Sequence, residues 1–218
     1  MTLARAAIFD LDGVLADTAR LHLAAWQRLA REEGFELPPD THERLKGVDR
    51  MASLTIALEG TTHVYSEAER TALADRKNRY YREQLGTITP RDLLPGADAL
   101  LKRLTSWQVP VALASASRNA REVIEGLDIA ECFDFIADAA AVSQPKPAPD
   151  IFLLAAEGLG VPPEVCVGIE DAAAGITAIH RAGMYAIGVG DAQILCEADY
   201  VVSDLTHFDP EPYFRARR

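Results

Sequence analysis

The sequence of 218 residues contains few cysteines and no long apolar run. Its three cysteines, Cys132, Cys166 and Cys196, are far apart and form no paired motif, which argues against a disulfide framework or a zinc site. Every apolar run is too short to span a bilayer, and Asp10 and Asp12 interrupt the only N-terminal segment that resembles a signal peptide. These features predict a cytoplasmic protein with reduced thiols and no membrane partner.

Positive charge is also scarce. There are 22 Lys and Arg residues against 33 Asp and Glu residues, which leaves a formal net charge of −11 at pH 7. This excess of negative charge disfavours nucleic acid and anionic membranes as partners. Hydrophobic residues make up 49% and charged residues 25%, as in ordinary globular proteins. We therefore expect a globular chain that binds a small molecule, and an anionic substrate would need local cations or a metal ion.

Short apolar runs, each followed by a polar residue, indicate buried strands. They are AAIF before Asp10, VPVALA before Ser115, VCVGI before Glu170 and YAIGVG before Asp191. The segments between them have helical periodicity, at 97–107, 121–127, 150–160 and 172–183. Strands that alternate with helices predict a parallel sheet covered on both faces, so the fold class is α/β and Rossmann-like.

One interval between strands is too long for a simple crossover. Asp12 and Ser115 are separated by more than three times the length of a strand–helix–strand unit, which is about 30 residues. The extra segments with helical periodicity are 18–35, 50–60 and 66–86. The sequence therefore predicts a small helical cap domain at 16–88, inserted into a core domain made of 1–15 and 89–218.

The two aspartates at the end of the first strand are expected to share one side of it. Residues two apart in a strand point the same way, and Gly13 allows the chain to turn immediately afterwards. Ligands of open parallel sheets bind beyond the carboxyl ends of the strands. The other polar residues expected at this edge are Ser115, Lys146, Glu170 and Asp171. A turn or helix-cap role would explain Asp12 or Asp171 alone, but not the whole set.

A divalent metal ion would explain this concentration of carboxylates. Carboxylate and carbonyl oxygens are the ligands that magnesium takes in phosphate-handling sites, and no His or Cys stands at these positions to favour zinc. A metal ion screens the repulsion between a carboxylate nucleophile and a phosphoryl group. The neighbouring carboxylate would then carry the proton of the leaving or attacking oxygen.

Four motifs carry a family resemblance. The segments FDLDGVLADT, VALAS, KPAPDIF and VGIEDAAAGITAIHRAGM, in this order, resemble the haloacid dehalogenase superfamily of phosphotransferases. The segments HLAAW, RLKGVDRMASL, DRKNRYY and SASRN resemble the β-phosphoglucomutase family. That family interconverts β-glucose 1-phosphate and glucose 6-phosphate with magnesium and a bisphosphorylated intermediate. The resemblance implies a magnesium-dependent phosphomutase.

The resemblance also implies the roles of the core residues. Asp10 would be the phosphorylated nucleophile and a magnesium ligand. Asp12 would be the general acid and base, and its backbone carbonyl would also bind the metal. Ser115 and Lys146 would hold the oxygens of the transferring phosphoryl group. The remaining metal ligands would be Glu170 and Asp171.

The cap would supply the sugar pocket and, with the core, a distal phosphate site. Arginine side chains match phosphate geometry. By the resemblance, the distal phosphate would be held by Arg50, Ser117, Arg118 and Asn119. The other substrate-binding residues would be Thr18, His22, Trp26, Lys46, Gly47, Val48, Ser53, Lys77 and Ala116. On general grounds Trp26 could instead be a core residue, His22 an exposed one and Lys77 part of a solvated helix face.

Several departures from the family pattern leave the sugar open. Arg118 stands where lysine is common, Pro145 precedes Lys146, Asp49 adds a negative charge near the distal phosphate site, and 61–66 has no clear counterpart. Other hexose phosphates and disaccharide phosphates therefore remain candidates. The alternative functions are a sugar phosphatase on the same fold and a non-catalytic sugar-phosphate-binding protein. A dehalogenase or phosphonatase is disfavoured by the second aspartate. We expect a monomer.

Overall fold

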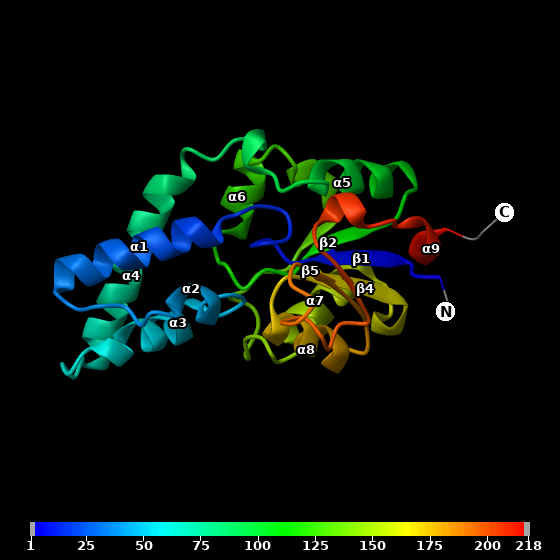
Figure 1. Ribbon diagram of the computed structural model, residues 1–218. Helices are drawn as coiled ribbons and strands as arrows, with labels where there is room; N and C mark the ends of the chain where they lie inside the picture. The colour runs from blue at the N-terminus through cyan, green and yellow to red at the C-terminus, as the bar shows by residue number, and fades with distance from the viewer. Residues whose placement is uncertain (1–2, 216–218) are drawn as a thin grey trace.

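The computed structural model describes residues 3–215, which contain one parallel sheet with the strand order β3-β2-β1-β4-β5-β6 (Figure 1). The strands are β1 (Ala6–Phe9), β2 (Val111–Leu113), β3 (Phe135–Ile136), β4 (Cys166–Glu170), β5 (Tyr185–Val189) and β6 (Tyr200–Val202). The α/β prediction is confirmed. The edge strands β3 and β6 were not predicted; unlike β1, β2 and β4, they are not fully buried and do not lie in a long unbroken apolar run.

Helices cover both faces of the sheet, as Figure 1 shows. They are α5 (Ala97–Ser106), α6 (Ala120–Gly126), α7 (Asp150–Leu159), α8 (Ala173–Arg181) and α9 (Glu211–Phe214). Ala7 and Phe9 of β1 pack in a hydrophobic core with α5, α6 and α9. Ala6 and Ile8 point the opposite way and pack in a second core with α7 and α8. A central strand buried on both faces therefore reads as an unbroken apolar run.

A second group of helices lies between β1 and α5 in the sequence. These are α1 (Ala19–Glu33), α2 (Thr41–Arg44), α3 (Arg50–Ala57) and α4 (Glu67–Leu85). The short 3-10 turns are η1 (Leu58–Gly60), η2 (Pro90–Asp92), η3 (Ala130–Cys132), η4 (Pro163–Val165) and η5 (Leu205–His207). Helices α1 and α4 pack against each other and bury Trp26 and Tyr81. The start of α4 is stabilised by a capping box, in which Ser66 and Glu69 bond each other's backbone N–H groups.

The helices α1–α4 extend away from the carboxyl edge of the sheet (Figure 1). Helices α1, α3 and α4 agree with the helical segments predicted at 18–35, 50–60 and 66–86, whereas the short helix α2 was not predicted. The division into a cap domain at 16–88 and a core domain remains a prediction. The ends of that core domain, 1–2 and 216–218, lie outside the described residues. None of the helices within 3–215 is long and apolar enough to cross a membrane.

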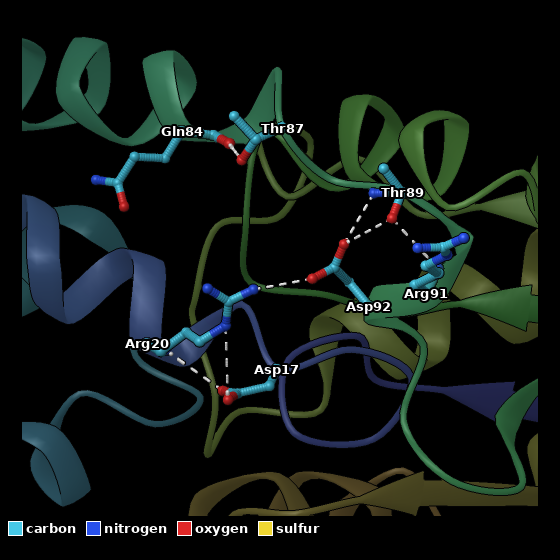
Figure 2. Close-up of polar contacts among 7 residues, drawn as sticks. All are labelled: Asp17, Arg20, Gln84, Thr87, Thr89, Arg91 and Asp92. Carbon is cyan, nitrogen blue, oxygen red and sulfur yellow. Dashed lines mark hydrogen bonds and ion pairs between the residues drawn. The ribbon is translucent and has the colours of Figure 1, made fainter.

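Two connections join this helical group to the sheet, and they contact each other. The backbone N–H of Leu94 donates to the carbonyl of Leu15 over 2.8 Å. Arg20, in the first turn of α1, donates to Asp92 of the second connection over 3.0 Å (Figure 2). The other carboxylate oxygen of Asp92 accepts from the backbone and hydroxyl of Thr89, as Figure 2 also shows. The two connections are thus tied by both backbone and side chains.

Candidate active site

The site begins where β1 ends. Asp10 directly follows the strand and is buried, and its backbone N–H donates to the Ile169 carbonyl of β4 over 2.9 Å. Gly13 has φ of +80°, a conformation that suits glycine, and a Cβ at this position would collide with the Asp171 carboxylate. The turn after β1 therefore brings the backbone close enough to Asp171 that only glycine fits.

Lys146 is the central cation of the site. Its Nζ lies 2.6 Å from Asp10 Oδ1 and 2.7 Å from Glu170 Oε2, and its side chain is fully buried. Burial opposes the charge on this lysine, but Asp10 and Glu170 outweigh that effect and raise its pKa. Glu170 is buried as well, and its Oε1 accepts from the backbone N–H groups of Asp171 and Ala172. Both oxygens of Glu170 therefore have protein partners.

Carboxylates crowd around this single lysine. One oxygen atom from each of Asp10, Glu170 and Asp171 lies within 4.8 Å of the others, which is a spacing that could hold a metal ion. Burial, together with Glu170, raises the pKa of Asp10 to about 8. Burial, Glu170 and Asp10 likewise raise the pKa of Asp171 to about 9. The shared cause is that these negative charges are desolvated and close together.

Asp12 lies nearby in a different environment. Its Oδ1 is buried and has no hydrogen-bond partner within residues 3–215. Burial raises its pKa to about 6, while the positive charges of Lys146 and Lys77 act in the opposite direction. The two aspartates after β1 are therefore not equivalent, since Asp10 is bound to Lys146 and Asp12 is not.

The segment that follows β2 forms another wall. Ser115 is buried, and its Oγ accepts from the backbone N–H of Ser117 over 3.1 Å. The Ser117 hydroxyl in turn accepts from the backbone N–H of Asn119 over 3.3 Å. The side chains from Ala116 to Asn119 line the cavity described below, and Arg118 is exposed there.

Helices α1 and α4 supply the opposite wall. Lys77 Nζ lies 2.7 Å from His22 Nδ1, and the His22 ring stacks on Tyr81 at a centroid distance of 3.8 Å. Lys77 is buried rather than solvated, and its Nζ lies 4.9 Å from the centroid of a Trp26 ring. Burial and the charge of Arg50 lower the Lys77 pKa to about 7. Burial and Lys77 lower the His22 pKa well below its usual value.

The loop before α3 faces the site with cationic and polar groups. Arg50 lies on the cavity wall, and burial and the positive charge of Arg118 lower its pKa. The sequence predicts Asp49 to be a negative charge near the distal phosphate site. In the structure Asp49 caps α3, because its carboxylate accepts from the backbone N–H groups of Met51 and Ala52. Its charge therefore interacts with the start of the helix.

These walls enclose a cavity of about 400 Å³. The predicted site residues that line it are Asp10, Asp12, His22, Trp26, Lys46, Gly47, Val48, Arg50, Ser53, Lys77, Ala116, Ser117, Arg118, Asn119, Lys146 and Asp171. Three other predicted residues, Thr18, Ser115 and Glu170, are buried and do not line it. The sequence reasoning missed Asn78 and Met51, which do line it. The position of Asn78 in the DRKNRYY segment, directly after Lys77, was a usable signal.

Comparison with known proteins identifies the family. Residues 4–183 match the model of haloacid dehalogenase-like hydrolases. The chain is 46% identical over 207 residues to a β-phosphoglucomutase of Bacillus subtilis, an alignment that covers 93% of this chain and 92% of that protein. It is 33% identical to a phosphorylated carbohydrates phosphatase of Thermotoga maritima, over 90% of this chain and 92% of that one.

A solved structure agrees. The β-phosphoglucomutase of Clostridium difficile superimposes with a TM-score of 0.92 at 43% identity, and the match covers 96% of this chain and 95% of that one. The fold and the carboxylate-rich site thus define an enzyme of the haloacid dehalogenase type. The chain belongs to the haloacid dehalogenase superfamily and, within it, to the β-phosphoglucomutase family. The family recognised from the sequence motifs is confirmed.

Proposed function

We propose that this protein is a β-phosphoglucomutase, which interconverts β-glucose 1-phosphate and glucose 6-phosphate through a phosphorylated aspartate and β-glucose 1,6-bisphosphate. The observation that carries the proposal is a single cavity with the Asp10–Lys146 pair on one wall and Arg50 and Lys77 on the other. A mutase must bind two phosphates at once, one at the reacting centre and one distant from it. Cations on two opposite walls meet that requirement.

Asp10 is the proposed nucleophile. The phosphoryl group on Asp10 passes to the C6 hydroxyl of β-glucose 1-phosphate, so the Asp10–phosphorus bond breaks and a new oxygen–phosphorus bond forms. Asp12 accepts the proton of that hydroxyl. After the bisphosphate turns round, Asp10 attacks the phosphorus on C1, the phosphorus–O1 bond breaks and Asp12 returns the proton to O1. Glucose 6-phosphate leaves and Asp10 is again phosphorylated.

The environments of the two aspartates support these separate roles. Asp10 accepts a hydrogen bond from Lys146, which orients the carboxylate and offers a cation to the phosphoryl oxygens. Asp12 has a buried carboxylate oxygen without a partner and a pKa raised to about 6, close to what a general acid and base needs near neutral pH. Ser115, buried beside them, is the proposed second ligand of the phosphoryl oxygens.

The donor set fits magnesium. The carboxylate oxygens of Asp10 and Asp171 are hard ligands within 4.8 Å of each other, and Gly13 leaves room for the Asp171 carboxylate. We propose that these two side chains and the Asp12 carbonyl hold the ion. Glu170 was predicted as a further ligand, but its bonds to Lys146 and to two backbone N–H groups favour a supporting position. When bound, magnesium would screen the repulsion between nucleophile and phosphate.

The remaining predicted residues have proposed places around the sugar. Arg50 and Arg118 lie on the cavity wall, where they would bind the distal phosphate together with Ser117 and Asn119. His22, Trp26 and Lys77 would line the sugar site from the cap side, with Lys46, Gly47, Val48, Ser53 and Ala116 as its other contacts. Thr18 is buried next to the first connection, so we propose that it supports the hinge between a cap at 16–88 and the core. Closure of that cap would exclude water from the phosphorylated Asp10.

We further propose that the enzyme works as a cytoplasmic monomer, without nucleic acid or membrane. The net charge of −11 supports the absence of nucleic-acid and anionic-membrane partners, and the three unpaired cysteines support a reducing compartment. The alternative function is a sugar phosphatase, which several relatives of about one-third identity carry in their names, among them the Thermotoga phosphatase. The paired cations on opposite walls favour the mutase, because hydrolysis of one phosphate does not require a second phosphate site.

The test uses purified protein, magnesium, β-glucose 1-phosphate and a trace of β-glucose 1,6-bisphosphate. Glucose 6-phosphate and free phosphate are measured in the same reaction. A mutase forms glucose 6-phosphate faster than phosphate. Release of phosphate alone would establish the phosphatase. If neither glucose 6-phosphate nor free phosphate forms, β-glucose 1-phosphate is excluded as the substrate.

A further inference from the structure

A side-chain hydrogen bond crosses the cavity wall from the helical group to the segment after β2. Asn119 Nδ2 donates to Asn78 Oδ1 over 2.9 Å, and both residues line the cavity. Asn78 belongs to α4, whereas Asn119 immediately precedes α6. The bond therefore links two elements that are 41 residues apart in the sequence.

Asn119 is the last residue of a segment that is ordered by two successive backbone-to-side-chain hydrogen bonds. Its backbone N–H donates to Ser117 Oγ, and the Ser117 N–H donates to Ser115 Oγ. Two local hydrogen bonds order the backbone of this segment, and the Asn119 amide at its end is held only by Asn78 within the described part of the chain, so the segment depends on Asn78 at that end. Without that partner the amide would rotate about two side-chain torsions.

The pair also leaves complementary groups free. Asn119 Oδ1 and Asn78 Nδ2 make no further hydrogen bond within residues 3–215, and both side chains are partly exposed toward the cavity. One free acceptor beside one free donor is the complement of a hydroxyl, which both donates and accepts.

We propose that Asn78 is a positioning residue for the distal phosphate site. Its carbonyl holds the Asn119 amide, and with it the segment Ser117–Asn119, in the orientation that binds substrate. Because Asn78 lies on α4, this orientation exists only while the helical group sits against the sheet. The inference rests on the proposed function for its substrate, and on the Asn78–Asn119 bond for its geometry.

A second contact on the same face of α4 provides a matched control. Arg82 is one turn after Asn78, and its Nε donates to Glu122 of α6 over 3.0 Å. The side chains of this pair are 58% and 41% exposed, so the interaction is screened by water and lies outside the cavity. An effect of Asn78 that merely reflected packing of α4 on α6 would be shared by Arg82.

The kinetic test compares the wild type with Asn78→Ala, Asn119→Ala and the double variant. Losing the preorganised orientation should raise KM for β-glucose 1-phosphate about two- to tenfold in Asn78→Ala, with a smaller change in kcat. The double variant should match Asn119→Ala, because Asn78 acts through Asn119. Arg82→Ala should remain within twofold of the wild type. Additive losses from Asn78 and Asn119, or an equal loss in Arg82→Ala, would overturn the proposal.

A second measurement separates this inference from the proposed function. Backbone hydrogen exchange of residues 115–119 needs no substrate, and it should be about two- to tenfold faster in Asn78→Ala than in the wild type. Asn78→Asp keeps the acceptor oxygen and should restore slow exchange. If the wild type forms no glucose 6-phosphate, the proposed function fails while this measurement still decides the role of Asn78. Unchanged exchange in Asn78→Ala would rule that role out.

Discussion

At the residue scale, two aspartates two positions apart have different neighbours, and the different tasks that we propose for them rest on this contrast. Asp10 is bound to Lys146, whereas Asp12 Oδ1 is buried without a partner in the described residues. The same contrast is what separates a nucleophile from a general acid and base: the first needs a fixed orientation and the second needs a proton that can leave.

The role of Asp12 is tested by Asp12→Ala. Turnover of β-glucose 1-phosphate should fall by about 10²–10⁴-fold, the contribution of a positioned acid–base group. Phosphorylation of Asp10 by a substrate with a good leaving group, such as an acyl phosphate, should fall much less, because that leaving group needs no proton. Asp10→Asn is the control and should lose both reactions. An unchanged mutase rate in Asp12→Ala would assign the acid to another residue.

Lys77 makes an unfavourable contribution to the stability of the folded protein, because burial disfavours its charged form. Its pKa is lowered from an ordinary 10.5 to about 7, chiefly by burial and then by Arg50. Between pH 7 and 10.5 the unfolded chain therefore binds a proton that the folded protein lacks. In this window the unfavourable contribution of Lys77 to folding shrinks as pH rises, and below pH 7 it is fully present.

This sign predicts the behaviour of Lys77→Met. The Tm of the variant minus that of the wild type should be largest at pH 6 and should fall steadily as the pH is raised to 9. The KM for the sugar phosphate should be higher in the variant at every pH. Calorimetry across the pH range measures the trend. Lys102→Met, an exposed lysine paired with Asp98, should show no such trend between pH 6 and 9. A flat difference for Lys77→Met would mean that buried Lys77 keeps its proton up to pH 9, so that its pKa is not lowered into this range.

At the element scale, the two connections between the sheet and the helical group act as one unit. They are joined by the Leu94–Leu15 backbone bond and by the Arg20–Asp92 pair (Figure 2). Arg20 also lies 3.8 Å from Asp17, so it sits between two carboxylates from different connections. An exposed ion pair contributes only about 0.2–1 kcal/mol, so it would bias the relative position of the connections without locking it.

Charge reversal at Arg20 tests this unit. Arg20→Glu places a third carboxylate beside Asp17 and Asp92, and the repulsion should separate the connections and weaken exclusion of water from the site. We expect the ratio of glucose 6-phosphate to free phosphate to fall about two- to fivefold, with a smaller fall in high salt. Lys102→Glu, at an exposed pair on α5, should leave the ratio unchanged. An unchanged ratio in Arg20→Glu would mean that the ion pair does not affect closure.

At the scale of the whole molecule, the topology concentrates negative charge at one point. The carboxyl ends of β1 and β4 meet at the centre of the sheet, and they place Asp10 and Glu170 on one buried lysine with Asp171 beside the two carboxylates. A divalent cation at this point would therefore favour the folded state over the unfolded one, which lacks the site.

Metal removal tests the site independently of catalysis. Dialysis against a chelator should lower Tm, and magnesium at about 100 times its dissociation constant should restore about 2.7 kcal/mol of stability. Asp171→Asn should lose most of this response. Asp98→Asn, an exposed carboxylate on α5, is the control and should keep it. Equal magnesium responses in the two variants would exclude a metal site at Asp171.

Local periodicity in the sequence was enough to predict most of the longer helices and the central strands. The apolar runs before Asp10 and Ser115 are β1 and β2, and the helical segment at 66–86 is α4. These elements could be predicted because each is long or apolar enough to show its period in sequence. The candidate site residues Asp10, Ser115 and Asp171 were also readable, because they come at the ends of buried strands.

What only the tertiary structure decided is which side chains meet across the cavity. The sequence alone could not decide between a solvated and a buried Lys77, and burial depends on how α1 packs on α4. Asn78 lies directly after Lys77 in the DRKNRYY segment, but its partner became evident only when α4 was placed beside Asn119. The sequence determined the strand-end chemistry, since it is encoded by neighbours along the chain. The contacts of Lys77 and Asn78 join residues 41 or more positions apart, and no local pattern records them.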